Sequence, residues 1–247
     1  MPKETTKKLL MQANWSEIVS VNFQIDPAIL EPRVPQGLEL DFHNNETYIS
    51  LIALRLNYVK MRGFPLPICR GFEGIGLRFY VKRKVGPRYV TGTCLIKDYV
   101  SSAIGAWVLS SLFKIKSSKV KLKRESSGFN SPDESVVPQV QYQWSIGDSQ
   151  NKLKVKGRAR MKKTGSDTKV GFILGHNNTY TERDSQAFEH RVERPPWTVW
   201  DAAQASFECN TKQMFGQEFV KTLARRPSSV FVSEGSPVTV FRPAVIS

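Results

Sequence analysis

The stretch QVQYQWSIGDSQNKLKVKGRARMKK, residues 139–163, alternates apolar and polar side chains on both sides of a short turn. In residues 139–146 the apolar side chains share one parity, and the glutamines and a serine share the other. In residues 151–163 small or apolar residues alternate with cations. Because successive side chains of a strand point to opposite faces, two such segments around GDSQ predict an antiparallel hairpin with one buried face.

The second half of this hairpin carries a row of cations on its predicted outward face. The row consists of Lys152, Lys154, Lys156, Arg158, Arg160 and Lys162. A second row precedes the hairpin and consists of Lys119, Lys121 and Lys123. Residues 114–169 hold 14 cations and 5 carboxylates, so this part of the chain contributes +9 of the net charge of +14.

Three interpretations of these rows stay open. They are the solvated outer face of a sheet, where charge prevents unwanted pairing of an edge; an anion-binding surface for nucleic acid or an anionic membrane; or a contact between copies of the chain. Aromatic side chains that would stack on bases are missing from the cationic parity of the strand. Such a surface would therefore attract phosphate without reading a base sequence.

The composition is that of a globular protein in a reducing compartment. Hydrophobic residues make up 40% of the 247 residues, enough for a substantial core. The three cysteines are widely spaced and form no CxxC pair, which argues against a disulfide framework and a zinc site. The start of the chain has no apolar segment of signal-peptide length, and the most apolar run, residues 99–113, is too short to span a bilayer. We therefore expect a cytoplasmic protein with no transmembrane segment.

Alternation recurs through the rest of the chain and indicates further strands. Strands are expected at 17–26, at 47–58, in a hairpin over 75–98, and in KVGFILG (169–175). Helices are expected over 99–113, with Asp98 as the cap, and over 201–219. This pattern predicts an α+β fold, a largely antiparallel closed β-barrel-like sheet with a few peripheral helices. We expect one domain over 1–247, with a frayed N-terminus over 1–14.

Candidate chemistry is concentrated in FEGIGLRFYVKRK (72–84). Arg78 and Tyr80 share one face of this predicted strand, whereas Glu73 has the opposite, core-facing parity unless a bulge turns it toward Arg78. The pair is either a structural ion pair or part of a polar cluster at a cavity mouth, where an arginine can hold a carboxylate. Among the histidines, only His190 lies on a predicted strand; His43 and His176 are expected in surface loops. No motif for a metal or a cofactor is present, so neither is expected.

Three segments in this order resemble the YqjF-like family of uncharacterised bacterial proteins, which belongs to the acetoacetate decarboxylase-like superfamily. They are VPQGLELD (34–41), FEGIGLRFYV (72–81) and FEHRVERPPWTVWDA (188–202). The resemblance implies a closed, largely antiparallel β structure around a central cavity. The decarboxylases of that superfamily use a lysine Schiff base. The comparable place here, SSAIGAWVLSS (101–111), contains no lysine, and the nearest are Lys97 and Lys114.

We therefore expect a barrel that binds a small organic carboxylate or carbonyl compound in its cavity. Arg78 would anchor the anion, Glu73 would orient Arg78, and Tyr80 and His190 would complete the ligand-binding set. Decarboxylase chemistry is disfavoured by the missing lysine, and whether the protein is an enzyme stays open. The competing hypothesis is a non-enzymatic electrostatic binder that uses the two cationic rows. The oligomeric state and the ligand are not predicted.

Overall fold

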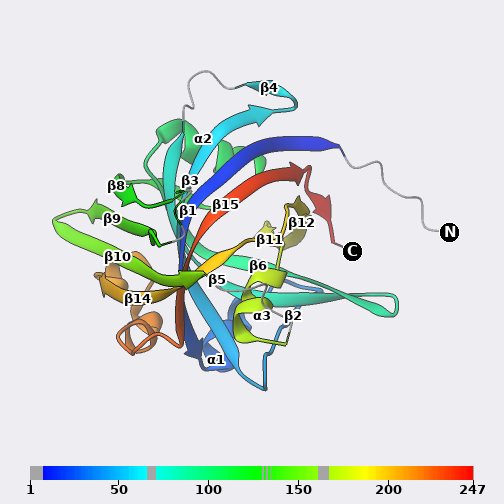
Figure 1. The fold of residues 1–247 in the computed structure, drawn as a ribbon. Helices are drawn as coiled ribbons and strands as arrows, with labels where there is room; N and C mark the ends of the chain where they lie inside the picture. The colour runs from blue at the N-terminus through cyan, green and yellow to red at the C-terminus, as the bar shows by residue number, and fades with distance from the viewer. Residues whose placement is uncertain are drawn as a thin grey trace.

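The computed structural model describes residues 8–65, 71–129, 131, 133, 135–160 and 167–246, apart from the side chains of Leu112, Ala159 and Arg160. The chain is mostly β, and Figure 1 shows its helices at the periphery of a large twisted sheet. The strands are β1 (Leu9–Ile25), β2 (Glu39–Leu40), β3 (Thr47–Met61), β4 (Phe64–Pro65), β5 (Phe72–Val85), β6 (Arg88–Val100), β7 (Ser117–Lys119), β8 (Lys121–Ser127), β9 (Gln139–Ile146), β10 (Ser149–Arg160), β11 (Asn178–Arg183), β12 (Gln186–His190), β13 (Val192–Glu193), β14 (Val199–Glu208), β15 (Ser229–Phe241) and β16 (Ala244–Val245). The helices are α1 (Pro27–Leu30), α2 (Ala103–Leu112), α3 (Lys169–Gly175), α4 (Thr211–Met214) and α5 (Val220–Leu223), with 3-10 turns η1 (Glu31–Arg33) and η2 (Gln217–Phe219).

The strands follow the order β16-β12-β11-β6-β5-β3-β1-β15-β14-β10-β9-β8, and short strands pair beside this path. Most pairs are antiparallel, and the parallel ones join β6 to β11 and to β7. The predicted antiparallel sheet with few helices is thus confirmed. The end strands β16 and β8 do not pair with each other within the described residues, so closure into a barrel stays a prediction.

The hairpin predicted over residues 139–163 is confirmed up to Arg160 as β9 and β10, and residues 161–163 lie outside the described residues. Its register pairs Trp144 with Asn151 and Tyr142 with Leu153. Leu153 is fully buried in the main core, whereas Lys154 and Lys156 on the alternate parity are exposed. The period-two pattern therefore assigned the inner and outer faces of this hairpin correctly.

The central strands β1, β3 and β5 are buried on both faces. One face carries the main core, to which β3 contributes Ile49, Leu51 and Ala53. The other face carries two smaller apolar clusters, to which β3 contributes Tyr48, Ile52, Leu54 and Leu56. Strands covered on both sides read as nearly continuous apolar runs. The sheet therefore separates two interiors, and the smaller of these holds the candidate site.

Several predicted elements are wrong. The expected helix over 201–219 is the strand β14 followed by the short α4, because residues 200–208 pair with β10 despite their alanine-rich sequence. The expected strand KVGFILG is the helix α3, which Thr168 caps through the amide of Gly171. Ser102, not Asp98, caps α2, since Asp98 belongs to β6.

The expected frayed N-terminus is also too long. Residues 9–14 form the start of β1 and pair with β15, because the side chains of Leu10, Met11 and Ala13 are buried there. Residues 1–7 lie outside the described residues.

Candidate functional site

A small cavity lies on the second buried face of the central sheet, between β1, β3 and β5 on one side and α3 and the segment 194–197 on the other. Its volume is about 40 Å³. It is lined by Trp15, Ile18, Ser20, Ile52, Leu54, Arg78, Tyr80, Thr93, Ile173, Leu174, His176, Asn177, Thr179, Arg194, Trp197 and Phe231. A water needs roughly 10–15 Å³ by this measure, so the cavity has room for about three waters or one small organic molecule.

Two arginines give the cavity its charge. Arg78 projects from β5, its Nε is buried, and no hydrogen-bond partner for this atom is found in the described part of the chain. Burial lowers the pKa of Arg78, although the charges of Tyr80 and Asp98 oppose this. Arg194 donates to the carbonyl of Leu174 at 2.7 Å, and burial and then the charge of Arg78 lower its pKa to about 10. Two cations that share one small cavity favour an anionic guest.

Tyr80 lies at the end of a buried hydrogen-bond chain. Its hydroxyl shares a hydrogen bond with Ser50, Ser50 donates to Oδ1 of Asn22 at 2.5 Å, and Ser20 donates to the same oxygen at 2.7 Å. Burial raises the pKa of Tyr80 to about 12, so the phenol is neutral at physiological pH. Because Ser50 gives its hydrogen to Asn22, the Tyr80 hydroxyl donates to Ser50, and its oxygen can still accept a hydrogen bond at the cavity wall.

His176 is a cavity residue that sequence reasoning missed. Its Nε2 lies 2.8 Å from Oδ2 of Asp41, its Nδ1 lies 2.7 Å from the carbonyl oxygen of Phe172, and its ring meets Tyr80 edge-on. Burial favours a neutral Asp41, but the hydrogen bond and charge of His176 and the charge of Lys82 outweigh it and lower the Asp41 pKa. The contact between His176 and Asp41 joins segments 135 residues apart. The local sequence, a histidine followed by two asparagines, does not predict it.

Asp98 on β6 is a partly buried carboxyl near Arg78. It accepts a hydrogen bond from Ser117 at 3.0 Å. Burial raises its pKa to about 7, although the bond from Ser117 and the charge of Arg78 oppose this. Near neutral pH the carboxyl of Asp98 is therefore only partly ionised, and it balances only part of the positive charge of Arg78.

The expected pairing of Glu73 with Arg78 is wrong. The register between β3 and β5 is regular from Phe72 to Phe79, so no bulge in β5 turns Glu73 to the face of Arg78. Glu73 instead accepts a hydrogen bond from Arg55 at 2.6 Å and another from Ser101 at 2.8 Å. It belongs to an ion-pair cluster on the opposite face of the sheet, which also contains Arg124 and Glu17.

His190 is buried but does not line the cavity. Its Nε2 lies 3.0 Å from the hydroxyl of Thr181, its Nδ1 has no partner among the described residues, and its ring stacks on Phe113. Burial lowers the pKa of His190 to about 4, which keeps the imidazole neutral. Of the four ligand-binding residues expected from the sequence, the structure therefore brings Arg78 and Tyr80 together in the cavity.

The two lysines closest to the decarboxylase position lie elsewhere. Lys97 and Lys114 line a separate hollow of about 270 Å³, together with Phe79 and Cys94. No lysine is among the described residues that line the cavity of Arg78. Within the described ranges, no group of three or more histidine, cysteine or acidic side chains is arranged to hold a metal ion.

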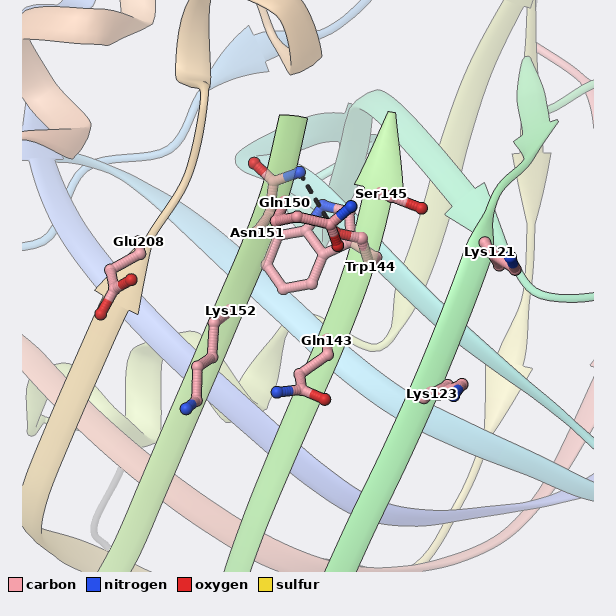
Figure 2. A pocket seen from close by; sticks show the side chains of 9 residues that line it. All are labelled: Lys121, Lys123, Gln143, Trp144, Ser145, Gln150, Asn151, Lys152 and Glu208. Carbon is pink, nitrogen blue, oxygen red and sulfur yellow. Dashed lines mark hydrogen bonds between the residues drawn. The ribbon is translucent and has the colours of Figure 1, made fainter. Parts of the chain in front are cut away.

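Most cations of the two rows lie on β8 and β10, on either side of β9, whereas Lys119 ends β7, which pairs with β6. The side chains of Lys119, Lys121, Lys123, Lys154, Lys156 and Arg158 are exposed and that of Lys152 is partly exposed, whereas the side chain of Arg160 and the whole of Lys162 lie outside the described residues. Register places Lys123, Gln143, Lys152 and Glu208 side by side on four neighbouring strands. Figure 2 shows these side chains on one side of the sheet, at a shallow hollow of about 510 Å³.

Comparison with known proteins places the chain in a family. Residues 12–237 match the family model DUF2071, described as "Uncharacterized conserved protein (COG2071)". The chain belongs to this family. The DUF2071 protein is 33% identical over 79 residues to the "Uncharacterized protein YqjF" of Bacillus subtilis (strain 168). That match covers 32% of this chain and 33% of the relative, so it spans about a third of the relative's length. The resemblance to YqjF-like proteins is confirmed.

Solved structures confirm the fold. An acetoacetate decarboxylase-like enzyme from Sphingomonas wittichii RW1 matches with a TM-score of 0.66 at 10% identity, over 96% of this chain and 93% of that chain. Acetoacetate decarboxylase from Legionella pneumophila has the same score and identity over 100% and 92%. The enduracididine biosynthesis enzyme MppR, complexed with pyruvate, has a TM-score of 0.61 at 10% identity over 99% and 93%. The DUF2071 protein thus has an acetoacetate decarboxylase-like fold. Among its described residues, no helix has both the length and the apolar character needed to cross a bilayer.

Proposed function

We propose that this DUF2071 protein is a single-domain cytoplasmic protein that binds a small organic carboxylate or carbonyl compound in the Arg78 cavity. The observation that carries the proposal is the buried Nε of Arg78, for which no hydrogen-bond partner is found among the described residues. A buried, unpaired hydrogen-bond donor costs free energy that an anionic guest would recover. A carboxylate matches the planar donor pattern of a guanidinium.

The neighbours of Arg78 suit a small keto acid. Arg194 adds a second cation, and Tyr80 and His176 supply polar groups that their own partners hold in place. The volume of about 40 Å³ limits the guest to a few heavy atoms. Pyruvate, which is bound to MppR, is of this size and chemistry, and MppR shares the fold.

A Schiff base is not part of the proposal. The described cavity wall offers no amine, because Lys97 and Lys114 line another hollow. Because they are charged, Arg78 and Arg194 can bind an anion electrostatically. Neither guanidinium can replace the lysine amine that forms the Schiff base in the decarboxylases.

Ligand-induced stabilisation tests the proposal. Acetate, pyruvate and acetoacetate should raise the melting temperature of the wild-type protein in a concentration-dependent way. Arg78→Met should abolish the increase, and Arg78→Lys should retain part of it. Lys84→Met, an exposed change on the β5–β6 hairpin, is the matched control and should respond like the wild type. An increase that survives Arg78→Met would refute the proposal. Borohydride treatment with pyruvate should label no lysine.

A second function has one specific observation in its favour. The exposed cations on β8 and β10 are separated by the glutamines of β9, and the carboxylates near them, Glu125 and Glu208, stand at the margins of the surface. Such a surface attracts polyanions such as nucleic acid, or anionic membranes. It predicts retention on heparin or DNA that collapses with modest salt, or binding to anionic vesicles. Neutralising Lys123, Lys152 and Lys154 should remove this retention and leave the pyruvate response intact.

A further inference from the structure

One edge of β14 is unpaired over much of its length. β14 pairs with β10 along Lys152–Arg160, but it pairs with β15 at three positions only, from Val199 to Asp201. A bulge at Ala203 follows, since Lys156 faces Gln204 while Gly157 faces Ala202. Bulges increase local twist and re-aim a strand, and this one accounts for the divergence of β14 from β15.

Past the bulge, residues 204–208 keep a regular register with β10 and have no strand on their other side. Within the described part of the chain, no backbone hydrogen bond joins residues 204–208 to any segment except β10. Half of the amides and carbonyls in such a segment point away from its one neighbour. Natural edges are usually protected by lysine, proline or a covering loop. The segment QASFE has none of the first two, and only its final Glu208 is charged.

A groove of about 500 Å³ runs along this edge, between β14 and residues 223–230. This volume lies within the range of about 300–1,000 Å³ that is usual for ligand sites. The larger apolar residues that line it are Val21, Phe23, Leu153, Phe207, Leu223 and Val230. Arg225 and Arg226 are exposed and also line the groove, and Asp201 is the one carboxylate among its described lining residues.

We infer that the β14 edge binds an extended acidic peptide segment as an added strand. The backbone of the guest would pair with residues 204–208. Alternate apolar side chains would fill the groove, and a glutamate or aspartate would pair with Arg225 or Arg226. The charge complementarity favours an acidic guest over a second copy of this chain, which carries +14 itself.

The test uses a fluorescent synthetic peptide of about seven residues that alternates valine and glutamate, a length matched to the free edge. Fluorescence polarisation should show saturable binding to the wild-type protein. The double variant Arg225→Glu, Arg226→Glu should weaken it at least about tenfold. The matched control carries the same charge change at the exposed Lys84 and Arg88 of the β5–β6 hairpin and should bind as well as the wild type. Melting curves verify that both double variants fold.

Backbone pairing has a separate readout. In an extended peptide, the N–H groups of the valines point to one side and those of the glutamates to the other. Methylation of the set that faces β14 should abolish binding, and methylation of the other set should not. Four outcomes would overturn the inference: no binding up to about 1 mM peptide, equal binding of a valine–lysine peptide, equal binding of both methylated peptides, or equal binding by the Arg225–Arg226 variant. A concentration-dependent dimer that the peptide dissociates would assign the edge to a second copy instead, and would also overturn it.

Discussion

Two titratable groups, the buried His190 and the partly buried Asp98, should give the protein opposite dependences of stability on pH. Burial lowers the pKa of His190 from 6.5 to about 4, and burial raises the pKa of Asp98 from 3.8 to about 7. Below pH 6.5 the unfolded chain takes up a proton at His190 that the folded chain does not, so the free energy of unfolding falls as the pH drops toward 4. For Asp98, the folded chain keeps a proton that the unfolded chain has lost, so the free energy of unfolding falls as the pH rises from about 4 to 7.

The size of each effect follows from the pKa difference. One pKa unit corresponds to about 1.4 kcal/mol, so His190 accounts for about 3 kcal/mol and Asp98 for about 4 kcal/mol, both as orders of magnitude. The two effects largely offset each other between pH 4 and 6.5 in the wild-type protein. Removing either group should uncover the other.

The variants His190→Gln and Asp98→Asn separate the two groups. Urea unfolding followed by tryptophan fluorescence, at intervals from pH 4 to 8, gives the free energy of unfolding for each protein. Relative to the wild type, His190→Gln should gain about 3 kcal/mol between pH 7 and 4. Asp98→Asn should gain about 4 kcal/mol, relative to the wild type, between pH 4 and 7. For each variant, the quantity to follow is its free energy of unfolding minus that of the wild type. If this difference stays constant with pH, the replaced side chain is not held in its neutral form by burial, and the reasoning for that residue is refuted.

Three further predictions concern stability and use the same assay. Glu73→Gln should cost about 1–3 kcal/mol because it removes the charge partner of the partly exposed Arg55, and no loss at all would contradict a stabilising ion pair. Gly76→Ala should cost about 1–3 kcal/mol because its methyl would lie 2.7 Å from a carboxylate oxygen of Asp98 and 3.1 Å from the backbone oxygen of Lys97, and a neutral result would mean that the Asp98 side chain moves aside at no cost. Leu153→Ala should lower the free energy of unfolding by about 2–5 kcal/mol, whereas Lys154→Ala should change it by no more than about 0.5 kcal/mol. Equal losses would contradict the assignment of inner and outer faces.

The sequence predicted the strands well where one face of a strand is wet. There the alternation of side chains reports burial directly, as in the β9–β10 hairpin. Prediction failed where tertiary pairing decides the local structure. Residues 201–208 have the composition of a helix but pair with β10, and KVGFILG has the composition of a strand but forms the capped helix α3.

The candidate site was predictable only in part, for a similar reason. Arg78 and Tyr80 lie two residues apart on one strand, so parity alone placed them together. His176 and Arg194 reach the same cavity from segments about a hundred residues further along the chain, and only the packing of α3 and the segment 194–197 against the sheet brings them there. No local pattern distinguishes them from surface residues.

Because both faces of β3 are covered, the burial of this strand limits which substitutions it can accept. Eight consecutive residues, Thr47 to Leu54, are buried, so a charge at any of them is costly. Yet Ser50 hydrogen-bonds Tyr80 of the cavity wall and Ile52 lines the cavity, whereas Leu51 and Ala53 face the main hydrophobic interior. Alternate positions of this single strand therefore separate the cavity wall from the main interior, so a laboratory evolution experiment aimed at the proposed guest can vary Ser50 and Ile52 while Leu51 and Ala53 stay unchanged.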